Sequence, residues 1–105
     1  MVEWCVIVYD KPGSDRSKFR PQHLAGVSHL VEQGKLVCAG AIYHEPTTEG
    51  SSERTFAGSH LQIVADTKQE ALDIVLNDVF AKEGIWDIDN IICYRFGCAA
   101  RKEKN

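Results

Sequence analysis

Four short runs of β-branched and aromatic residues alternate with two segments of helical periodicity, and this order constrains the fold more than any other feature. The runs cover residues 4–9, 36–43, 58–65 and 91–96. Such runs are typical of strands, whereas apolar residues at three- and four-residue spacing are typical of helices. The order strand, helix, strand, strand, helix, strand is that of the split βαβ unit. We therefore predict an α+β, ferredoxin-like domain with helices on one sheet face.

The first predicted helix has a clear beginning and end. Pro21 suits the first helical position, where its missing N–H group would have no partner, and Gly34 is the usual residue after a helix ends. Between them, Leu24, Val27, Leu30 and Val31 recur at helical spacing. This spacing predicts a helix that ends near Gly34.

The second predicted helix opens with a capping box, because Thr67 is followed three residues later by Glu70. The apolar period continues to residues 77–80, where we expect this helix to end. Asp78 follows Ile74 by four residues, so a helical Asp78 would lie at the margin of the buried face.

Length and charge indicate one domain and exclude some partners. At 105 residues the chain can form one hydrophobic core, and we assign residues 1–98 to this domain and 99–105 to a solvated tail. A net charge of -3 argues against nucleic-acid binding, which needs a basic surface. No stretch approaches the roughly 18 to 20 apolar residues of a membrane span, and residues 1–4 do not resemble a secretory signal. The expected location is the cytoplasm.

The cysteines are expected to be reduced thiols. Cys5, Cys38 and Cys93 lie within apolar runs, where a buried thiol packs as a small hydrophobic group, and the sequence has no C-x-x-C pair. Cys98 lies beyond the last predicted strand and is expected to be more exposed. The histidines do not have the spacing of metal ligands, so we expect neither a metal nor a cofactor.

His23 and Asp78 are the leading candidates for chemistry. His23 shares a helical face with Val27 and Leu30, so its ring should point toward the sheet. A neighbouring carboxylate can fix the tautomer of a histidine, which is the usual construction of a general acid or base. The residues alone leave a second interpretation open, in which the pair is a structural bond that joins the two helices.

Three further side chains are candidates for substrate binding: Arg16, Arg20 and Ser59. The two arginines precede His23 closely and are suited to hold an anionic group of a substrate. Ser59 lies in the third predicted strand, which we expect near the first helix. In the second strand, Gly40 marks either a bulge or a close approach to a ligand or to backbone.

One sheet face of so small a domain is expected to remain uncovered by helices. If Trp4, Val6, Val8 or their neighbours point outward, this face needs a partner. We expect a homodimer packed sheet to sheet, with an interface of about 800 Å² per partner.

Several short segments, taken in order, resemble the YCII-related family over nearly the whole chain. They are Tyr9-Asp10-Lys11-Pro12-Gly13-Ser14, Arg20-Pro21-Gln22-His23-Leu24, Gly34-Lys35-Leu36, Ala39-Gly40, Gly58-Ser59 and Asp78-Val79-Phe80. The resemblance implies a dimeric α/β barrel, in which two ferredoxin-like units pack sheet to sheet and leave a cleft in each. It also implies that His23 and Asp78 are the family's proposed active-site pair. The chain departs from the family at Val79, where the family has proline.

The resemblance indicates two classes of function. Enzymatic relatives look like lyases or dehydrochlorinases of hydroxylated aromatic compounds. The first hypothesis is therefore a cofactor-independent lyase, dehydrochlorinase or isomerase, which uses His23 and Asp78 on a small oxygenated substrate of anionic or phenolic character. The alternative is a noncatalytic module that binds a metabolite or another protein.

Overall fold

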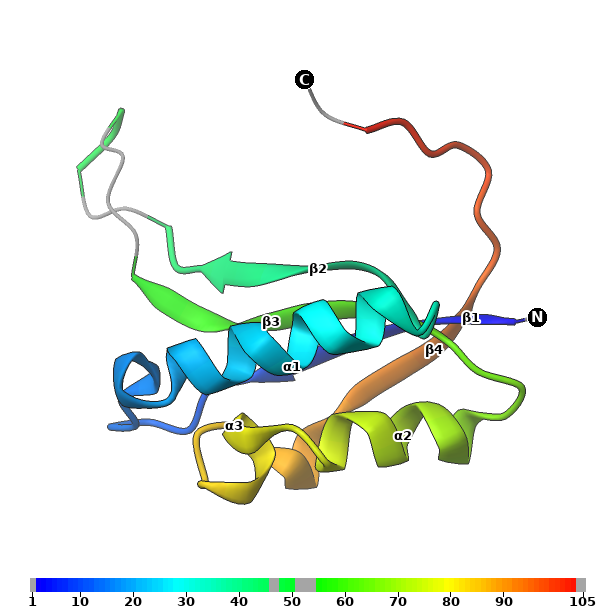
Figure 1. Cartoon of the computed structure of the whole chain (residues 1–105). Helices are drawn as coiled ribbons and strands as arrows, with labels where there is room; N and C mark the ends of the chain where they lie inside the picture. Colours follow the sequence, from blue (N-terminus) through cyan, green and yellow to red (C-terminus); the bar gives the residue numbers. More distant parts are fainter. Residues whose placement is uncertain (1, 46–47, 51–54, 104–105) are drawn as a thin grey trace.

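A four-stranded antiparallel sheet carries all the α-helices on one face (Figure 1). The computed structural model describes residues 2–45, 48–50 and 55–103. The strands are β1 (Glu3–Tyr9), β2 (Leu36–Tyr43), β3 (Phe56–Val64) and β4 (Ile92–Phe96), in the spatial order β2-β3-β1-β4. The helices are α1 (Arg20–Glu32), α2 (Lys68–Leu76) and α3 (Val79–Lys82), with short 3₁₀ turns η1 (Arg16–Lys18) and η2 (Ile88–Asn90). The predicted α+β, ferredoxin-like fold is confirmed.

The second predicted helix is in fact two helices separated by a break. Helix α2 ends at Leu76, and Asp78 has the extended conformation φ -70°, ψ 146° before α3 begins. The Asp78 carboxylate accepts a 2.8 Å hydrogen bond from the backbone N–H of Phe80. The prediction of one helix running into residues 77–80 was wrong, because a short carboxylate side chain stabilises a helix start better than a helix interior.

The capping box at the start of α2 is only half formed. The Thr67 hydroxyl accepts from the N–H of Glu70 at 3.2 Å, as predicted. The Glu70 carboxylate, however, accepts from the N–H of Asp66 at 3.3 Å. The start of α2 is therefore stabilised by two hydrogen bonds, one of which reaches a residue before the cap.

The hydrophobic core lies between the sheet and the helices. Val6 and Val8 of β1 are fully buried there, so they are not outward-facing residues. Their sequence neighbours, including Cys5 and Ile7, therefore point to the opposite face. The largest fully buried side chain is that of Trp86, from the segment after α3. Other core residues are Leu36, Leu61, Ile63, Ala71, Val75 and Phe80.

The opposite face of the sheet is open, since within the described ranges no helix lies on it (Figure 1). Tyr94 is 68% exposed there. Cys38 is also exposed and Cys5 is partly exposed, so the prediction that both thiols are buried was wrong. Both residues occupy outward positions, paired with Gln62 in the sheet. Cys93 points to the core and is buried, and all four cysteines are free thiols as predicted.

The segment after β4 leaves on the open side of the sheet (Figure 1). Arg101 pairs with the Glu3 carboxylate, which also accepts from the Gln62 amide at 3.1 Å. The hydrogen bond from Arg101 is the largest cause that lowers the pKa of Glu3 below its ordinary value. The predicted solvated tail is therefore attached to the sheet at Arg101, although that side chain remains 45% exposed.

Gly58, rather than Gly40, is the strand glycine that allows a close approach of backbone. A Cβ atom at Gly58 would lie 2.5 Å from the Val8 carbonyl oxygen, whereas one at Gly40 would meet nothing within 4 Å. The irregularities of β2 occur between Leu36 and Cys38 and between Ile42 and Tyr43. The prediction of a bulge or a close backbone contact at Gly40 was therefore wrong, whereas its approach to a ligand stays a prediction.

Within the ranges that the structure describes, no helix has the length and apolar character needed to span a membrane.

Candidate functional site

The imidazole of His23 is held between α1 and the α3 region. Its ring stacks on Phe80 with centroids 4.0 Å apart and an angle of 11°, and the ring of Trp86 meets it edge-on at 5.6 Å. The His23 side chain is 11% exposed. Because α1 begins at Arg20, His23 lies in the first turn of the helix, where its position is set by the helix start.

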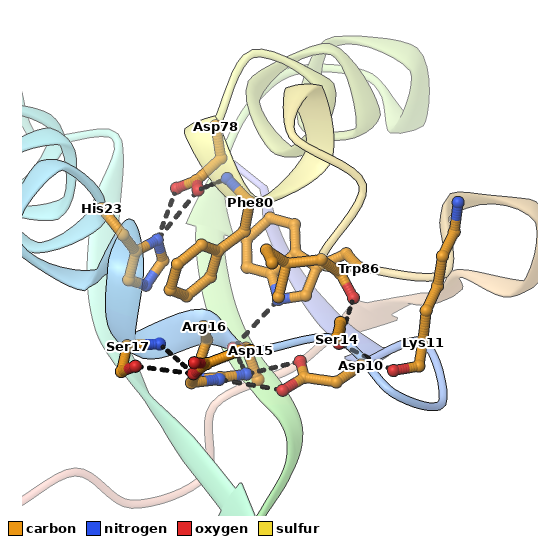
Figure 2. Close-up of polar contacts among 12 residues, drawn as sticks. Asp10, Lys11, Ser14, Asp15, Arg16, Ser17, His23, Asp78, Phe80 and Trp86 are labelled. Carbon is orange, nitrogen blue, oxygen red and sulfur yellow. Dashed lines mark hydrogen bonds and ion pairs between the residues drawn. The ribbon is translucent and has the colours of Figure 1, made fainter.

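Asp78 fixes the hydrogen-bonding state of His23. The Nδ1 atom lies 2.9 Å from Oδ1 and 2.8 Å from Oδ2 of the carboxylate (Figure 2). An ionised carboxylate can only accept, so Nδ1 must carry the proton in this contact. In the neutral ring, Nε2 then holds the free lone pair. This nitrogen points away from Asp78, on the side where Arg16 lies (Figure 2).

A second buried pair, Arg16 with Asp10, lies below the histidine. Arg16 donates from Nε at 2.9 Å and from Nη2 at 2.6 Å to the two oxygens of Asp10. The side chains are 5% and 12% exposed, respectively. The guanidinium also lies 4.9 Å from the ring centroids of both Phe56 and Phe80. Bidentate pairing and two ring contacts make Arg16 a rigid group.

Ser59 of β3 connects Arg16 with the core. Its hydroxyl accepts from Arg16 Nη2 at 3.1 Å and from the indole nitrogen of Trp86 at 3.2 Å. The residue is 3% exposed. Ser59 faces the helices because it is on the same side of β3 as the buried Leu61.

A cavity of about 150 Å³ lies between α1 and β2. Its wall includes His23, Arg16, Arg20 and Ser59, together with Tyr43 and Ala41 of β2. A cavity of about this size in an engineered protein binds benzene, so the space suits a single six-membered ring. The structure thus brings the four predicted residues of the wall together. Asp78 does not line the cavity; it contacts Nδ1 of His23 from outside the cavity.

The two arginines at this cavity differ in accessibility. Arg16 is buried, and the positive charge of its guanidinium is balanced by Asp10. Arg20 is exposed and, within the ranges that the structure describes, forms no ion pair. Of the two, Arg20 is therefore the free positive charge at the cavity.

Sequence reasoning did not find Asp10 and Trp86 as parts of the site. Asp10 was named only within a segment that resembles the family, and Trp86 was assigned no role. The available signal was Arg16, because an arginine that becomes buried needs a carboxylate partner. In residues 2–45, 48–50 and 55–103, no three His, Cys, Asp or Glu side chains are grouped as metal ligands.

Comparison with known proteins finds relatives in fungal biosynthesis. The chain is 30% identical over 90 residues to the aspercryptin biosynthesis cluster protein B of Emericella nidulans; this match covers 84% of the chain and 58% of the relative. The chain thus spans little more than half of that relative's length. It is also 26% identical over 96 residues to the fusaric acid biosynthesis protein 2 of Gibberella fujikuroi, covering 90% of the chain and 91% of the relative.

A similar solved structure is that of 5-chloro-2-hydroxyhydroquinone dehydrochlorinase (TftG) from Burkholderia phenoliruptrix, in complex with 2,5-dihydroxybenzoquinone. The TM-score is 0.74 at 27% sequence identity, and the match covers 90% of this chain and 93% of that one. Residues 2–95 match the family model of the YCII-related domain. The chain therefore belongs to the YCII-related domain family.

Proposed function

We propose that the protein is a cofactor-independent enzyme that removes a proton from a small oxygenated ring compound. His23 acts as the base, and Asp78 orients it. The observation that carries this proposal is the position of His23, which lines a ring-sized cavity while Asp78 holds its Nδ1 from outside that cavity. A positioned base of this kind typically supplies about 10²- to 10⁴-fold in rate.

The proposed reaction class is an elimination or an isomerisation. His23 Nε2 takes a proton from carbon or from a hydroxyl group, and the electron pair left behind forms a new double bond. In an elimination, the leaving group departs as an anion with its own bonding pair; in an isomerisation, a proton returns at another atom. Neither step needs an electron acceptor. The name of the similar dehydrochlorinase supports the elimination, and the fungal relatives support a small organic substrate.

Deuterium exchange tests this function before a product is known. Ring hydrogens of hydroxylated benzenes exchange with D₂O when a base removes a proton from the keto tautomer, and NMR follows this loss of signal. The wild-type protein should accelerate exchange in at least one member of a panel of chlorinated and unchlorinated hydroxyquinols. His23→Gln should lose about 10²-fold or more of that acceleration. The matched control is His29→Gln, an exposed histidine of the same helix. Equal exchange by wild type and His23→Gln would refute the role of His23.

We further propose that the protein is a homodimer joined through its open sheet faces. The support is the apolar surface there, since Tyr94, Val37 and Phe96 are 68%, 43% and 38% exposed. Sedimentation of Tyr94→Lys should show a weaker dimer. Leu76→Lys, at an exposed apolar position of α2, is the control that should leave assembly unchanged.

The cytoplasmic location remains a prediction from the sequence, to be tested by cell fractionation.

A further inference from the structure

Both acceptor positions of the Ser59 hydroxyl are occupied. Arg16 Nη2 and Trp86 Nε1 lie 3.1 and 3.2 Å from its oxygen. Guanidinium and indole nitrogens can only donate, so the oxygen accepts in both bonds. A serine hydroxyl has two lone pairs and one proton, and the proton is therefore the part left for another partner. Among the described residues, no acceptor is bonded to this proton.

The two donors that hold Ser59 are themselves fixed. Arg16 is bound by both oxygens of Asp10 and lies against two phenylalanine rings. Trp86 is fully buried, and its ring meets that of Phe80 edge-on at 5.6 Å. The rotation of the Ser59 hydroxyl is therefore set by the protein before any ligand binds. Such preorganised donors are the ones that stabilise developing negative charge effectively.

The hydroxyl group of Ser59 lies at the cavity that His23 also lines. Ser59 is 3% exposed, and the same cavity of about 150 Å³ is lined by Ser59, Arg16 and His23. A buried O–H group without an acceptor is unfavourable, so the site favours a ligand that supplies one. Because Asp10 balances the charge of Arg16, the attraction for an anionic oxygen of a ligand comes from the dipole of the Ser59 O–H group.

We infer that Ser59 is a hydrogen-bond donor to an anionic oxygen of the substrate, and that Arg16 and Trp86 are positioning residues that aim its proton. This inference rests on the proposed function and names the substrate class: a single-ring compound with a phenolate or enolate oxygen. His23 removes a proton on one side of the ring, and Ser59 holds the oxygen on which negative charge develops. His23 comes from α1 and Ser59 from β3, so the base and the donor lie on different walls of the cavity.

The probe for this inference is 4-nitrophenol, because its phenol and phenolate forms absorb at different wavelengths. Titration of the protein-bound probe with pH gives the affinity of each form. The wild type should prefer the phenolate and so lower the pKa of the bound probe. Ser59→Ala should lose about tenfold of this preference, in line with the loss of one hydrogen bond to a charged group. Ser59→Thr, which keeps a hydroxyl, should retain most of it.

Two further variants separate a donor role from a merely structural one. Trp86→Phe keeps an aromatic ring but frees one lone pair of Ser59, so the hydroxyl proton can turn away and the preference should fall. Ser28→Ala, an exposed serine of α1, should leave it unchanged. Thermal unfolding checks that each variant is folded. If Ser59→Ala does not fold, Ser59→Thr still provides the test.

Failure of this inference can be distinguished from failure of the proposed function. An unchanged phenolate preference in Ser59→Ala, or no saturable binding of the probe by the wild type, would overturn the role of Ser59. Exchange that depends on His23 would then still support the enzyme. Conversely, loss of the preference in Ser59→Ala, with exchange that does not depend on His23, would leave a binding site for phenolates and remove the proposed base.

Discussion

The Asp78 carboxylate lies 2.8 Å from His23 Nδ1, and one of its oxygens also accepts a hydrogen bond from the backbone N–H of Phe80 at the start of α3. One side chain thus orients the histidine and links two helices. This link matters for packing too, because no residue among the 13 of α1 is fully buried. A chemical role and a structural role of Asp78 predict different results for the same substitutions.

Asp78→Asn should separate these two roles. Asparagine is as good a helix cap as aspartate, so the start of α3 should survive and the free energy of unfolding should fall by only about 1 kcal/mol. The amide no longer requires a proton on Nδ1, so the tautomer of His23 is lost and proton exchange should fall by about 10²-fold or more.

The measurements for Asp78→Asn are deuterium exchange and urea unfolding. Asp73→Asn is the control, because Asp73 is an exposed carboxylate of α2 whose hydrogen bond to Gln69 stays within the helix. A large loss of stability with exchange unchanged would show that the His23 contact is only structural.

Loss of the Asp10 charge should destabilise the fold strongly. Asp10→Asn leaves the guanidinium of Arg16 without a counterion at 5% exposure, and breaking a buried pair in this way costs about 3 to 5 kcal/mol. Arg20→Gln, which changes an exposed arginine near the same cavity, should alter the free energy of unfolding by less than about 0.5 kcal/mol. Equal stability of the two variants in urea unfolding would contradict this assignment.

The sequence predicts local structure well where one residue has one plausible place. Pro21 and Gly34 bracket the first helix correctly because each is suited to a helix end, and Gly34 indeed has φ +73°. Asp78 was misplaced because the same apolar period fits a continuous helix and a helix followed by a cap. A local pattern does not reveal which of these is better packed.

The site itself was predictable only in part, for reasons of distance along the chain. His23 and Asp78 were found because a histidine on an apolar helix face needs a partner. The contacts of Ser59 with Arg16 and Trp86 join residues 43 and 27 positions apart. Such contacts depend on how strands and helices pack, and no spacing rule within one element contains them.

The tail contact on the open face should depend on pH. The hydrogen bond from Arg101 lowers the pKa of Glu3. The stability that this ionised carboxylate contributes is therefore fully present at a pH above its ordinary pKa of 4.5. It is lost as pH falls through the lowered pKa of the folded protein, below 4.5. NMR relaxation of Arg101 should therefore show a rigid side chain near neutral pH and a mobile one in acid. A Glu3→Gln variant should lack this transition, and an acid transition that persists there would assign it to another group.

Thiol alkylation should distinguish the two faces of the sheet. Burial raises the pKa of Cys93, so less of its reactive thiolate is present at a given pH and it should react last with iodoacetamide. Cys38 and Cys98 are exposed and should react first in dilute protein. If open faces join in a homodimer, Cys38 should become protected as the protein concentration rises, while Cys93 stays slow throughout. Mass spectrometry of the labelled peptides measures each rate. Rates at Cys38 that do not change with concentration, although sedimentation shows a dimer, would place the dimer interface elsewhere.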